Sequence, residues 1–187
     1  MKKTLIVIGI IVVVVFLFGS FLISGFNTAR SKNEAVTAQW AQVENQLKRR
    51  YDLIPNLVET VKGYAAQEKS VFLGVAEARK AYFTAPDVAS KARAAGEVEG
   101  ALSRLLLLQE RYPELKSNEN FLKLQDSLEG SENRISVERK RYNDLVRELN
   151  VFTKTFPGNV FSSWAGVKEA QYFNVPEAQK EAPKVKF

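Results

Sequence analysis

The chain has 187 residues, with 27 Lys and Arg against 21 Asp and Glu, a formal net charge of +6 at pH 7, and neither cysteine nor histidine. This composition excludes disulfides, cysteine nucleophiles, histidine-based catalytic triads and zinc sites with Cys or His ligands. The length corresponds to about one domain plus an anchor. Removing Lys2 and Lys3 leaves 25 basic residues against 21 acidic ones, an excess of only four. Since nucleic-acid binders carry a strongly basic face, we predict no nucleic-acid partner.

The N-terminal stretch from Thr4 to Phe26 contains no charged residue and is dense in Ile, Val, Leu and Phe. At about 1.5 Å per residue it is long enough to cross a hydrocarbon core of about 30 Å. We therefore predict a membrane span from Thr4 to Phe26. A cleaved signal peptide is the alternative, but its shorter apolar region would end in small residues, where this chain has Phe26. A buried soluble helix is disfavoured because the run is apolar on every face.

The charges that flank the span favour one orientation only slightly. Lys2 and Lys3 favour a cytoplasmic N-terminus, whereas Arg30 and Lys32 on the other flank nearly balance them. The short N-terminal tail also favours this arrangement. It places the helical domain on the extracytoplasmic side.

The first helix after the span is predicted over residues 31–83, because apolar residues recur every three or four positions. Pro55 lies inside this pattern, lacks an N–H and clashes with the preceding turn. Since the apolar phase is kept across Pro55, we predict one kinked helix rather than a sharp reversal. The skipped position of the pattern is Arg50. The pattern consists of Val36, Trp40, Val43, Leu47, Ile54, Leu57, Val61, Tyr64 and Val71.

Two further long helices are predicted. The second begins around Thr84-Ala85-Pro86-Asp87, with Thr84 as the cap and Pro86 in the first turn, and ends before Pro113. The third follows the capping residues 117–120 and has a regular heptad pattern, typical of coiled coils and antiparallel bundles. Its seam positions are Phe121, Leu124, Leu128, Ser131, Ile135, Glu138, Tyr142, Leu145, Leu149, Phe152 and Phe156.

Pro157-Gly158 ends the third helix, and a short amphipathic piece is predicted over 161–173. The predicted fold is therefore all-α: an N-terminal transmembrane helix followed by an elongated up-and-down bundle of three long helices plus a short C-terminal helix. The predicted division is a transmembrane anchor over 1–27, a helical bundle over 28–173 and a flexible C-terminal tail over 174–187.

A difference in helix length suggests an interface. A first helix of about fifty residues would measure roughly 75 Å, against roughly 40 Å for a second helix of about twenty-six. The apolar residues Trp40, Val43 and Leu47 would then face water, and such seams usually mark an interface. Together with Arg50 they form the candidate interface, which either the short C-terminal helix or a second copy of the protein would cover.

Charged and amide residues on the helices are the only candidates for chemistry. Most are expected to be solvated ion pairs worth about 0 to 1 kcal/mol each. Arg50 and Glu138 differ because each falls in a seam position, where a charge is costly unless paired. We predict structural roles, and neither catalysis, cofactor, metal nor small-molecule substrate. The candidate structural polar positions are Asp52, Asn56, Glu132, Asn133, Arg134, Glu138 and Asn143.

Several motifs resemble the LemA family of bacterial membrane-anchored helical proteins. The longest is Arg49-Arg50-Tyr51-Asp52-Leu53-Ile54-Pro55-Asn56-Leu57-Val58, followed by Val61-Lys62-Gly63-Tyr64. Further ones are Glu132-Asn133-Arg134-Ile135, Arg141-Tyr142-Asn143 and Phe156-Pro157. The resemblance covers nearly the whole chain and implies a one-span membrane protein with a helical-bundle domain. It implies no particular activity.

These observations predict a non-enzymatic, membrane-anchored helical scaffold or assembly protein of the bacterial cytoplasmic membrane, which self-associates into a larger oligomer. Its partners would be the lipid bilayer, through the N-terminal helix, and either further copies of itself or another membrane protein. The alternative is an accessory or regulatory subunit of a membrane protease or envelope-stress complex. A hydrolase or transferase of unrecognised type is a weaker third hypothesis.

Overall fold

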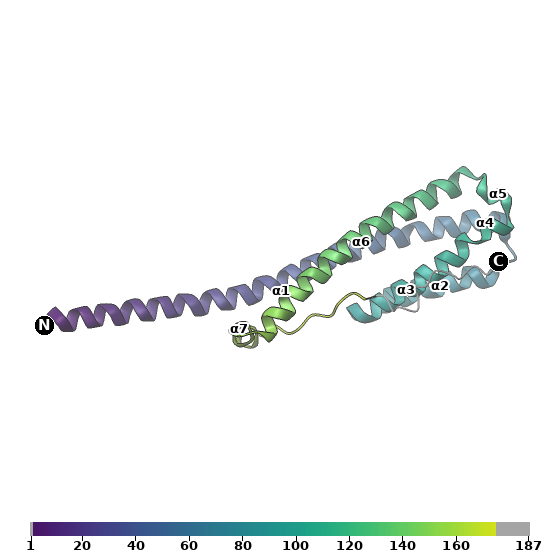
Figure 1. The fold of residues 1–187 in the computed structure, drawn as a ribbon. Helices are drawn as coiled ribbons and strands as arrows, with labels where there is room; N and C mark the ends of the chain where they lie inside the picture. The colour runs from purple at the N-terminus through teal and green to yellow at the C-terminus, as the bar shows by residue number, and fades with distance from the viewer. Residues whose placement is uncertain (1, 175–187) are drawn as a thin grey trace, which may run out of the picture. The chain divides into compact units, whose positions relative to one another are not determined.

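The computed structural model describes residues 2–174, in which every regular element is a helix (Figure 1). The prediction of an all-α fold is confirmed. Most of the predicted tail, 175–187, lies outside the described residues, and the division into anchor, bundle and tail stays a prediction. The helices are α1 (Lys2–Ala65), α2 (Lys69–Thr84), α3 (Val88–Leu106), α4 (Leu108–Arg111), α5 (Pro113–Lys116), α6 (Glu119–Lys154) and α7 (Gly158–Ala165).

The chain forms two compact units. The first combines the residues up to Trp40 with Asp144–Ala170, and the second combines Ala41–Asn143 with the segment that starts at Gln171. We describe each unit separately below. Both α1 and α6 contribute residues to the two units.

α1 contains the predicted membrane span. Its large apolar side chains from Leu5 to Phe18 are all more than half exposed. Within the described residues, α1 alone is long and apolar enough to cross a membrane, and its most apolar window is not buried. A buried soluble helix is therefore not what this segment forms. α1 also continues through Pro55, as predicted.

The first correction concerns the end of α1, because the helix predicted over 31–83 stops at Ala65. A turn at Ala66 and Gln67 leads into α2, whose buried residues include Phe72 and Tyr82. The turn contains no Pro or Gly, so local propensity predicts no break there. Packing of α2 against α3 overrides that propensity, since a longer α1 would leave the apolar face of α2 without a core.

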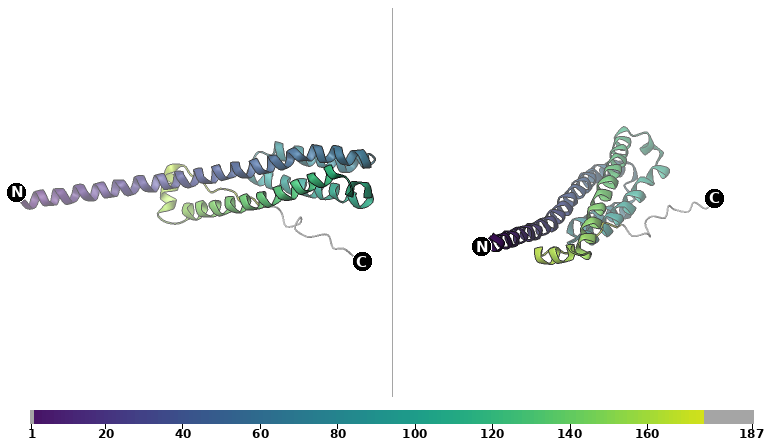
Figure 2. Two further views of the ribbon diagram at one scale, coloured as in Figure 1. Left: turned by 90° about the horizontal axis from the view of Figure 1, so that it is seen from above. Right: turned by 60° about the vertical axis from the view of Figure 1, so that its left-hand side comes forward.

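The second unit is consequently a bundle of four helices rather than three. The C-terminal part of α1, the helices α2 and α3, and the N-terminal part of α6 alternate in direction along the chain, and α2 lies beside α3 (Figures 1 and 2). Burial of each large apolar side chain stabilises the bundle by about 1.5–3 kcal/mol. Its buried residues include Val43, Leu47, Tyr51, Ile54, Leu57, Val61, Val75, Val98, Leu102, Leu105, Phe121 and Ile135.

The prediction that part of the first helix is left uncovered also fails. Val43 is 0% exposed and Leu47 3% exposed, so the prediction that they face water is wrong. Arg50 is 7% exposed, and Trp40 is half-buried. The candidate interface of these four residues is therefore largely internal. Its apolar residues are covered by the protein's own helices.

The boundaries of α3 also differ from the prediction. Asp87, rather than Thr84, caps the helix, and its carboxylate accepts a hydrogen bond of 2.9 Å from the backbone N–H of Ser90. Thr84 is instead the last residue of α2. The chain after Leu106 forms the short helices α4 and α5, so the second long helix is shorter than expected.

α6 begins after Asn118, whose side chain accepts a hydrogen bond from the Phe121 N–H at 2.9 Å. Alternate seam positions are buried as the heptad pattern predicts: Phe121, Leu128, Ile135, Tyr142 and Leu149. Phe156 is the exception. It is exposed because α6 ends at Lys154, before the pattern does.

In the first unit, α7 packs against α1. The rings of Phe161 and Phe21 meet edge to face at 5.3 Å between centroids, and those of Trp164 and Phe26 at 5.0 Å. α7 is shorter than the predicted piece over 161–173, because Gly166 ends it in the left-handed conformation, with φ 67°.

Candidate functional site

An ion cluster formed by the buried Arg50 and the half-exposed Glu99 and Glu132 lies on the four-helix bundle. The Arg50 guanidinium on α1 is 2.8 Å from the Glu99 carboxylate on α3 and also pairs with the Glu132 carboxylate on α6. A buried cation is costly unless it is paired, and here two carboxylates pair with one guanidinium. The cluster therefore links residues of three helices at one level.

The surroundings of the ion cluster are mixed in polarity. It lines a small cavity of about 150 Å³ together with Leu47, Tyr51, Ala95, Gly96, Ile135, Arg139 and Phe173. Burial raises the pKa of the Glu99 carboxyl, while the Arg50 charge acts in the opposite direction. Within the described residues no group of acidic, Cys or His side chains is arranged to hold a metal. The cluster is suited to hold helices together.

Two buried tyrosines lie beside the ion cluster. The rings of Tyr51 on α1 and Tyr82 on α2 meet edge to face at 4.7 Å. Burial raises the pKa of both phenols well above the ordinary value. The neighbouring Tyr82 raises the pKa of Tyr51 further, and the Glu44 carboxylate raises that of Tyr82. The Tyr82 hydroxyl has no hydrogen-bond partner in the part of the chain that the structure describes.

A pair of side chains on α6 holds the extended segment that follows α7. The Asn143 amide donates to the Phe173 carbonyl at 3.1 Å and accepts from the Phe173 N–H at 2.9 Å. The Tyr142 hydroxyl donates to the Gln171 carbonyl at 2.8 Å. Because these bonds reach only backbone atoms, they satisfy the extended chain as a neighbouring strand would.

The first unit repeats this arrangement with Asn150. Its amide donates to the Ala170 carbonyl at 2.9 Å and accepts from the Ala170 N–H at 2.8 Å. Asn150 is 7% exposed, so this two-way bond also satisfies a buried amide. Lys32 and Glu148 form a salt bridge of 3.2 Å in the same unit.

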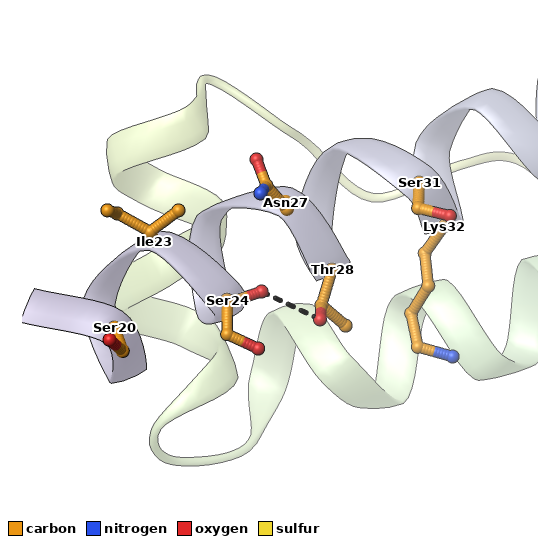
Figure 3. A pocket seen from close by; sticks show the side chains of 7 residues that line it. All are labelled: Ser20, Ile23, Ser24, Asn27, Thr28, Ser31 and Lys32. Atoms are coloured by element: carbon orange, nitrogen blue, oxygen red, sulfur yellow. Dashed lines mark hydrogen bonds between the residues drawn. The ribbon is translucent and has the colours of Figure 1, made fainter. Parts of the chain in front are cut away.

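α1 also lines an open hollow of about 720 Å³ near the end of its apolar stretch. Its side chains come from successive turns of α1, where the neighbouring pairs 23/24, 27/28 and 31/32 repeat every four residues (Figure 3). The Thr28 hydroxyl donates to the Ser24 carbonyl at 2.8 Å, which satisfies it within its own helix. The lining residues are Ser20, Ile23, Ser24, Asn27, Thr28, Ser31 and Lys32.

The predicted structural polar positions have different surroundings. Glu132 joins the ion cluster, and Asn143 holds Phe173. Glu138 pairs with Arg141 at 2.9 Å on the same helix. Asp52 lies 3.8 Å from Arg79 on α2. The remaining three, Asn56, Asn133 and Arg134, are exposed.

Sequence reasoning missed Glu99 as a partner of Arg50. A signal was present, because Glu99 follows Ala92 by seven residues and Ala95 by four, which places it on the small-residue face of α3. The role of Phe173 carries no comparable signal, since its backbone makes the bonds.

Comparison with known proteins identifies the family. A family model described as the LemA family matches residues 39–187. The chain is 27% identical over 195 residues to magnetosome protein MamQ 2 of Paramagnetospirillum magneticum, an alignment that covers 90% of this chain and 71% of the relative. It is 25% identical over 183 residues to magnetosome protein MamQ of Magnetospirillum gryphiswaldense, covering 84% and 67%. With its apolar N-terminal helix and helical bundle, this chain is a membrane-associated helical protein and belongs to the LemA family.

Proposed function

We propose that this protein is a non-enzymatic, single-pass scaffold of the bacterial cytoplasmic membrane that acts by binding other polypeptides. The observation that carries the proposal is the continuity of α1. One helix supplies both the exposed apolar stretch and the first helix of the bundle, without a linker between them. Such a helix attaches a binding domain directly to its anchor.

A groove on the bundle supports a binding role. It has a volume of about 630 Å³, lies along α1 and α2, and is lined by Ile54, Pro55, Val58, Phe72, Leu73 and Ala76 among others. Leu73 is exposed. Because exposed apolar surface of this kind marks interaction sites in proteins, we propose that a polypeptide binds here. A second copy of the chain is the occupant that a self-associating scaffold requires.

The alternative function is that of an accessory or regulatory subunit of a membrane protease or envelope-stress complex. The same groove supports it, because an amphipathic helix of a foreign chain would bury the same apolar residues. The two hypotheses differ in what the groove binds. The identity of the bound chain therefore separates them.

The test is the particle mass of the full-length protein extracted in mild detergent, with every co-purifying chain identified. A homo-oligomer whose mass falls to that of a monomer in Leu73→Glu supports the scaffold. A stoichiometric foreign chain that is lost in Leu73→Glu supports the accessory role. The matched control is Leu122→Glu on α6, which changes an exposed leucine outside the groove and leaves the mass unchanged. A monomer without partners contradicts both.

The proposed orientation has its own test, because the chain contains no natural cysteine. Ser70 is exposed on α2, and Ser70→Cys introduces a single thiol on the bundle. With the bundle on the extracytoplasmic side, a membrane-impermeant maleimide labels this thiol in intact cells. Labelling only after the cells are broken would place the bundle in the cytoplasm.

A further inference from the structure

α7 presents an apolar face that the first unit leaves more than half exposed. Phe156, Val160 and Trp164 are 84%, 56% and 60% exposed. They follow one another at intervals of four residues, which aligns them on one side of the helix and the turn before it. We call these three residues the outer face of α7. The opposite face, with Gly158, Phe161 and Ala165, is buried.

The packing partners of α7 place it at the end of the predicted membrane span. Its Phe161 ring meets Phe21, and the Trp164 ring meets Phe26, the last residue of the span. Phe21 precedes Phe26 by five residues, or about 7.5 Å along a helix. Helices that lie in a membrane surface bury their apolar faces about 5–10 Å into it. α7 therefore lies beside the part of α1 that is expected at the boundary between acyl chains and headgroups.

Gly25 makes this close approach possible. A Cβ atom at this position would lie 2.4 Å from the Phe161 ring, closer than side chains tolerate. A Cβ atom added at the nearby Gly19 would have no other atom within 4 Å. Close packing of α7 therefore requires a glycine at residue 25, whereas residue 19 has room for a side chain.

Charge and polarity around α7 also suit a membrane surface. No residue from Thr155 to Val167 is charged; lysines 154 and 168 border this stretch, and Lys154 pairs with Glu169 at 2.8 Å. On α1, the Arg30 guanidinium lies 5.7 Å from the centre of the Phe26 ring, just beyond the span. Cations in this position lie level with lipid phosphates, while Trp is favoured at the boundary itself.

The polar side chains of α7 lie on a separate flank. At about 100° per residue, Asn159 and Ser163 are rotated by about 100° from Val160 and Trp164. Both line a hollow of about 570 Å³ whose lining also includes Lys168 and Glu169. α7 therefore has one buried, one apolar exposed and one polar face, as expected of a helix that lies at the boundary between lipid and water.

We propose that α7 is an interfacial helix whose outer face inserts into the surface of the bilayer, giving the protein a second membrane contact beside α1. The proposal rests on the proposed function, since it requires α1 to span the membrane. The occupant of the outer face is lipid: the acyl chains nearest the headgroups of the leaflet where the span ends.

The test uses the two tryptophans of the chain. Full-length protein is reconstituted into vesicles of phosphatidylethanolamine and phosphatidylglycerol that contain lipid brominated either near the headgroup or at the end of the acyl chain. Trp40→Phe leaves Trp164 as the only reporter, and Trp164→Phe leaves Trp40. We expect the lipid brominated near the headgroup to quench Trp164 emission at least about twofold. Trp40, about 21 Å along α1 beyond Phe26, should be little affected.

Two charge substitutions in the Trp40→Phe background test whether the outer face is responsible. Val160→Asp places a carboxylate on the outer face and is expected to reduce the quenching of Trp164 by at least about half. Ser163→Asp places the same group on the polar flank and should leave the quenching unchanged. Neither side chain belongs to the buried face of α7.

The outcomes separate the two proposals. If an alkaline wash releases the protein from the vesicles, the membrane anchor fails, and the interfacial helix fails with it. If the protein is retained but Trp164 is quenched no more than Trp40, the anchor stands and the interfacial helix is wrong. Equal effects of Val160→Asp and Ser163→Asp would also contradict the proposed outer face.

Discussion

The guanidinium of Arg50 on α1 pairs with the carboxylate of Glu132 on α6, 82 positions later in the sequence. Arg50 is buried, whereas both carboxylates of the ion cluster are about half exposed. Removing Arg50 therefore loses two ion pairs and the packing of its methylene stem, while water can still solvate the carboxylates. We expect Arg50→Ala to lower the free energy of unfolding by about 2–4 kcal/mol.

The measurement for Arg50 is denaturant unfolding of the purified full chain in mild detergent. The neighbouring Arg49 is exposed, and Arg49→Ala is expected to change stability by no more than about 0.5 kcal/mol. Arg50→Lys keeps the charge without the guanidinium fork and should fall between the two. Similar effects of Arg49→Ala and Arg50→Ala would show that the ion cluster contributes little.

Tyr82 and Tyr142 are both buried, but among the described residues only the Tyr142 hydroxyl has a hydrogen-bond partner. Tyr82→Phe removes a buried hydroxyl that lacks a partner and should leave stability unchanged or raise it by up to about 1–3 kcal/mol. Tyr142→Phe loses the bond to Gln171 and should lower stability by about 0.5–1.5 kcal/mol. Thermal unfolding of the two variants measures the difference, and a larger loss for Tyr82→Phe would be the contrary result.

The buried tyrosines predict a loss of stability in alkali. Burial raises the pKa of Tyr142 to about 12, and those of Tyr51 and Tyr82 are raised as well, against about 10 in the unfolded chain. The folded state keeps protons that the unfolded state loses. Their contribution is therefore fully present below about pH 10 and is lost as the pH rises through the folded-state pKa values.

The alkaline prediction is measured by unfolding at a series of pH values, with tyrosinate absorbance followed in parallel. In Tyr51→Phe the decline above about pH 10 should be shallower, since one titrating group is removed. A profile that is flat up to about pH 12 would mean that these phenols are accessible to solvent when the protein is folded.

Because the Asn143 amide both donates to and accepts from the Phe173 backbone, we predict that a carboxylate at this position cannot hold the extended segment. Asn143→Asp keeps the acceptor for the Phe173 N–H but loses the donor to its carbonyl. We expect the Phe173 amide hydrogen to exchange with solvent at least about tenfold faster, because each 1.4 kcal/mol of lost protection corresponds to a factor of ten. Asn133 is exposed on the same helix, and Asn133→Asp serves as the control. Equal exchange rates in both variants would argue against the prediction.

Gly25 predicts a strict limit on side-chain size where α7 docks. Gly25→Ala places a methyl group against the Phe161 ring and should weaken docking by about 1–3 kcal/mol. Cysteines introduced at Phe26 and Trp164, whose rings lie 5.0 Å apart, should then cross-link more slowly with a short bifunctional maleimide. Gly19→Ala, where nothing lies within 4 Å, should leave the rate unchanged. If cross-linking slows equally in both variants, the slowing does not come from the contact with Phe161.

The regular parts of the fold could be predicted from the sequence because their apolar periodicity is long. The heptad of α6 is buried at Phe121, Leu128 and Ile135, and α1 runs through Pro55. The turn after Ala65 could not be predicted, because its residues favour a helix and only packing of α2 on α3 breaks it. Val43 and Leu47 were expected to face water because the prediction compared only the first two helices. In the structure both are buried, and Leu47 lies beside residues of α3 and α6.

The candidate site was predictable only in part. Arg50 was identifiable because it occupies a seam position, where a charge must find a partner. The identity of that partner depends on the order in which helices pack, which periodicity does not determine. Glu138 also occupies a seam position, but it pairs with Arg141 on its own helix, and Glu99 completes the cluster instead.

The most direct test of the account is whether α1 holds the intact chain in the membrane. Membranes containing the full-length protein are washed with alkaline carbonate, and the mass of the retained protein is determined. The account predicts that the protein stays in the membrane as the uncleaved chain of 21.0 kDa. Release into the wash, or a retained form shortened by the apolar N-terminal stretch, would contradict it.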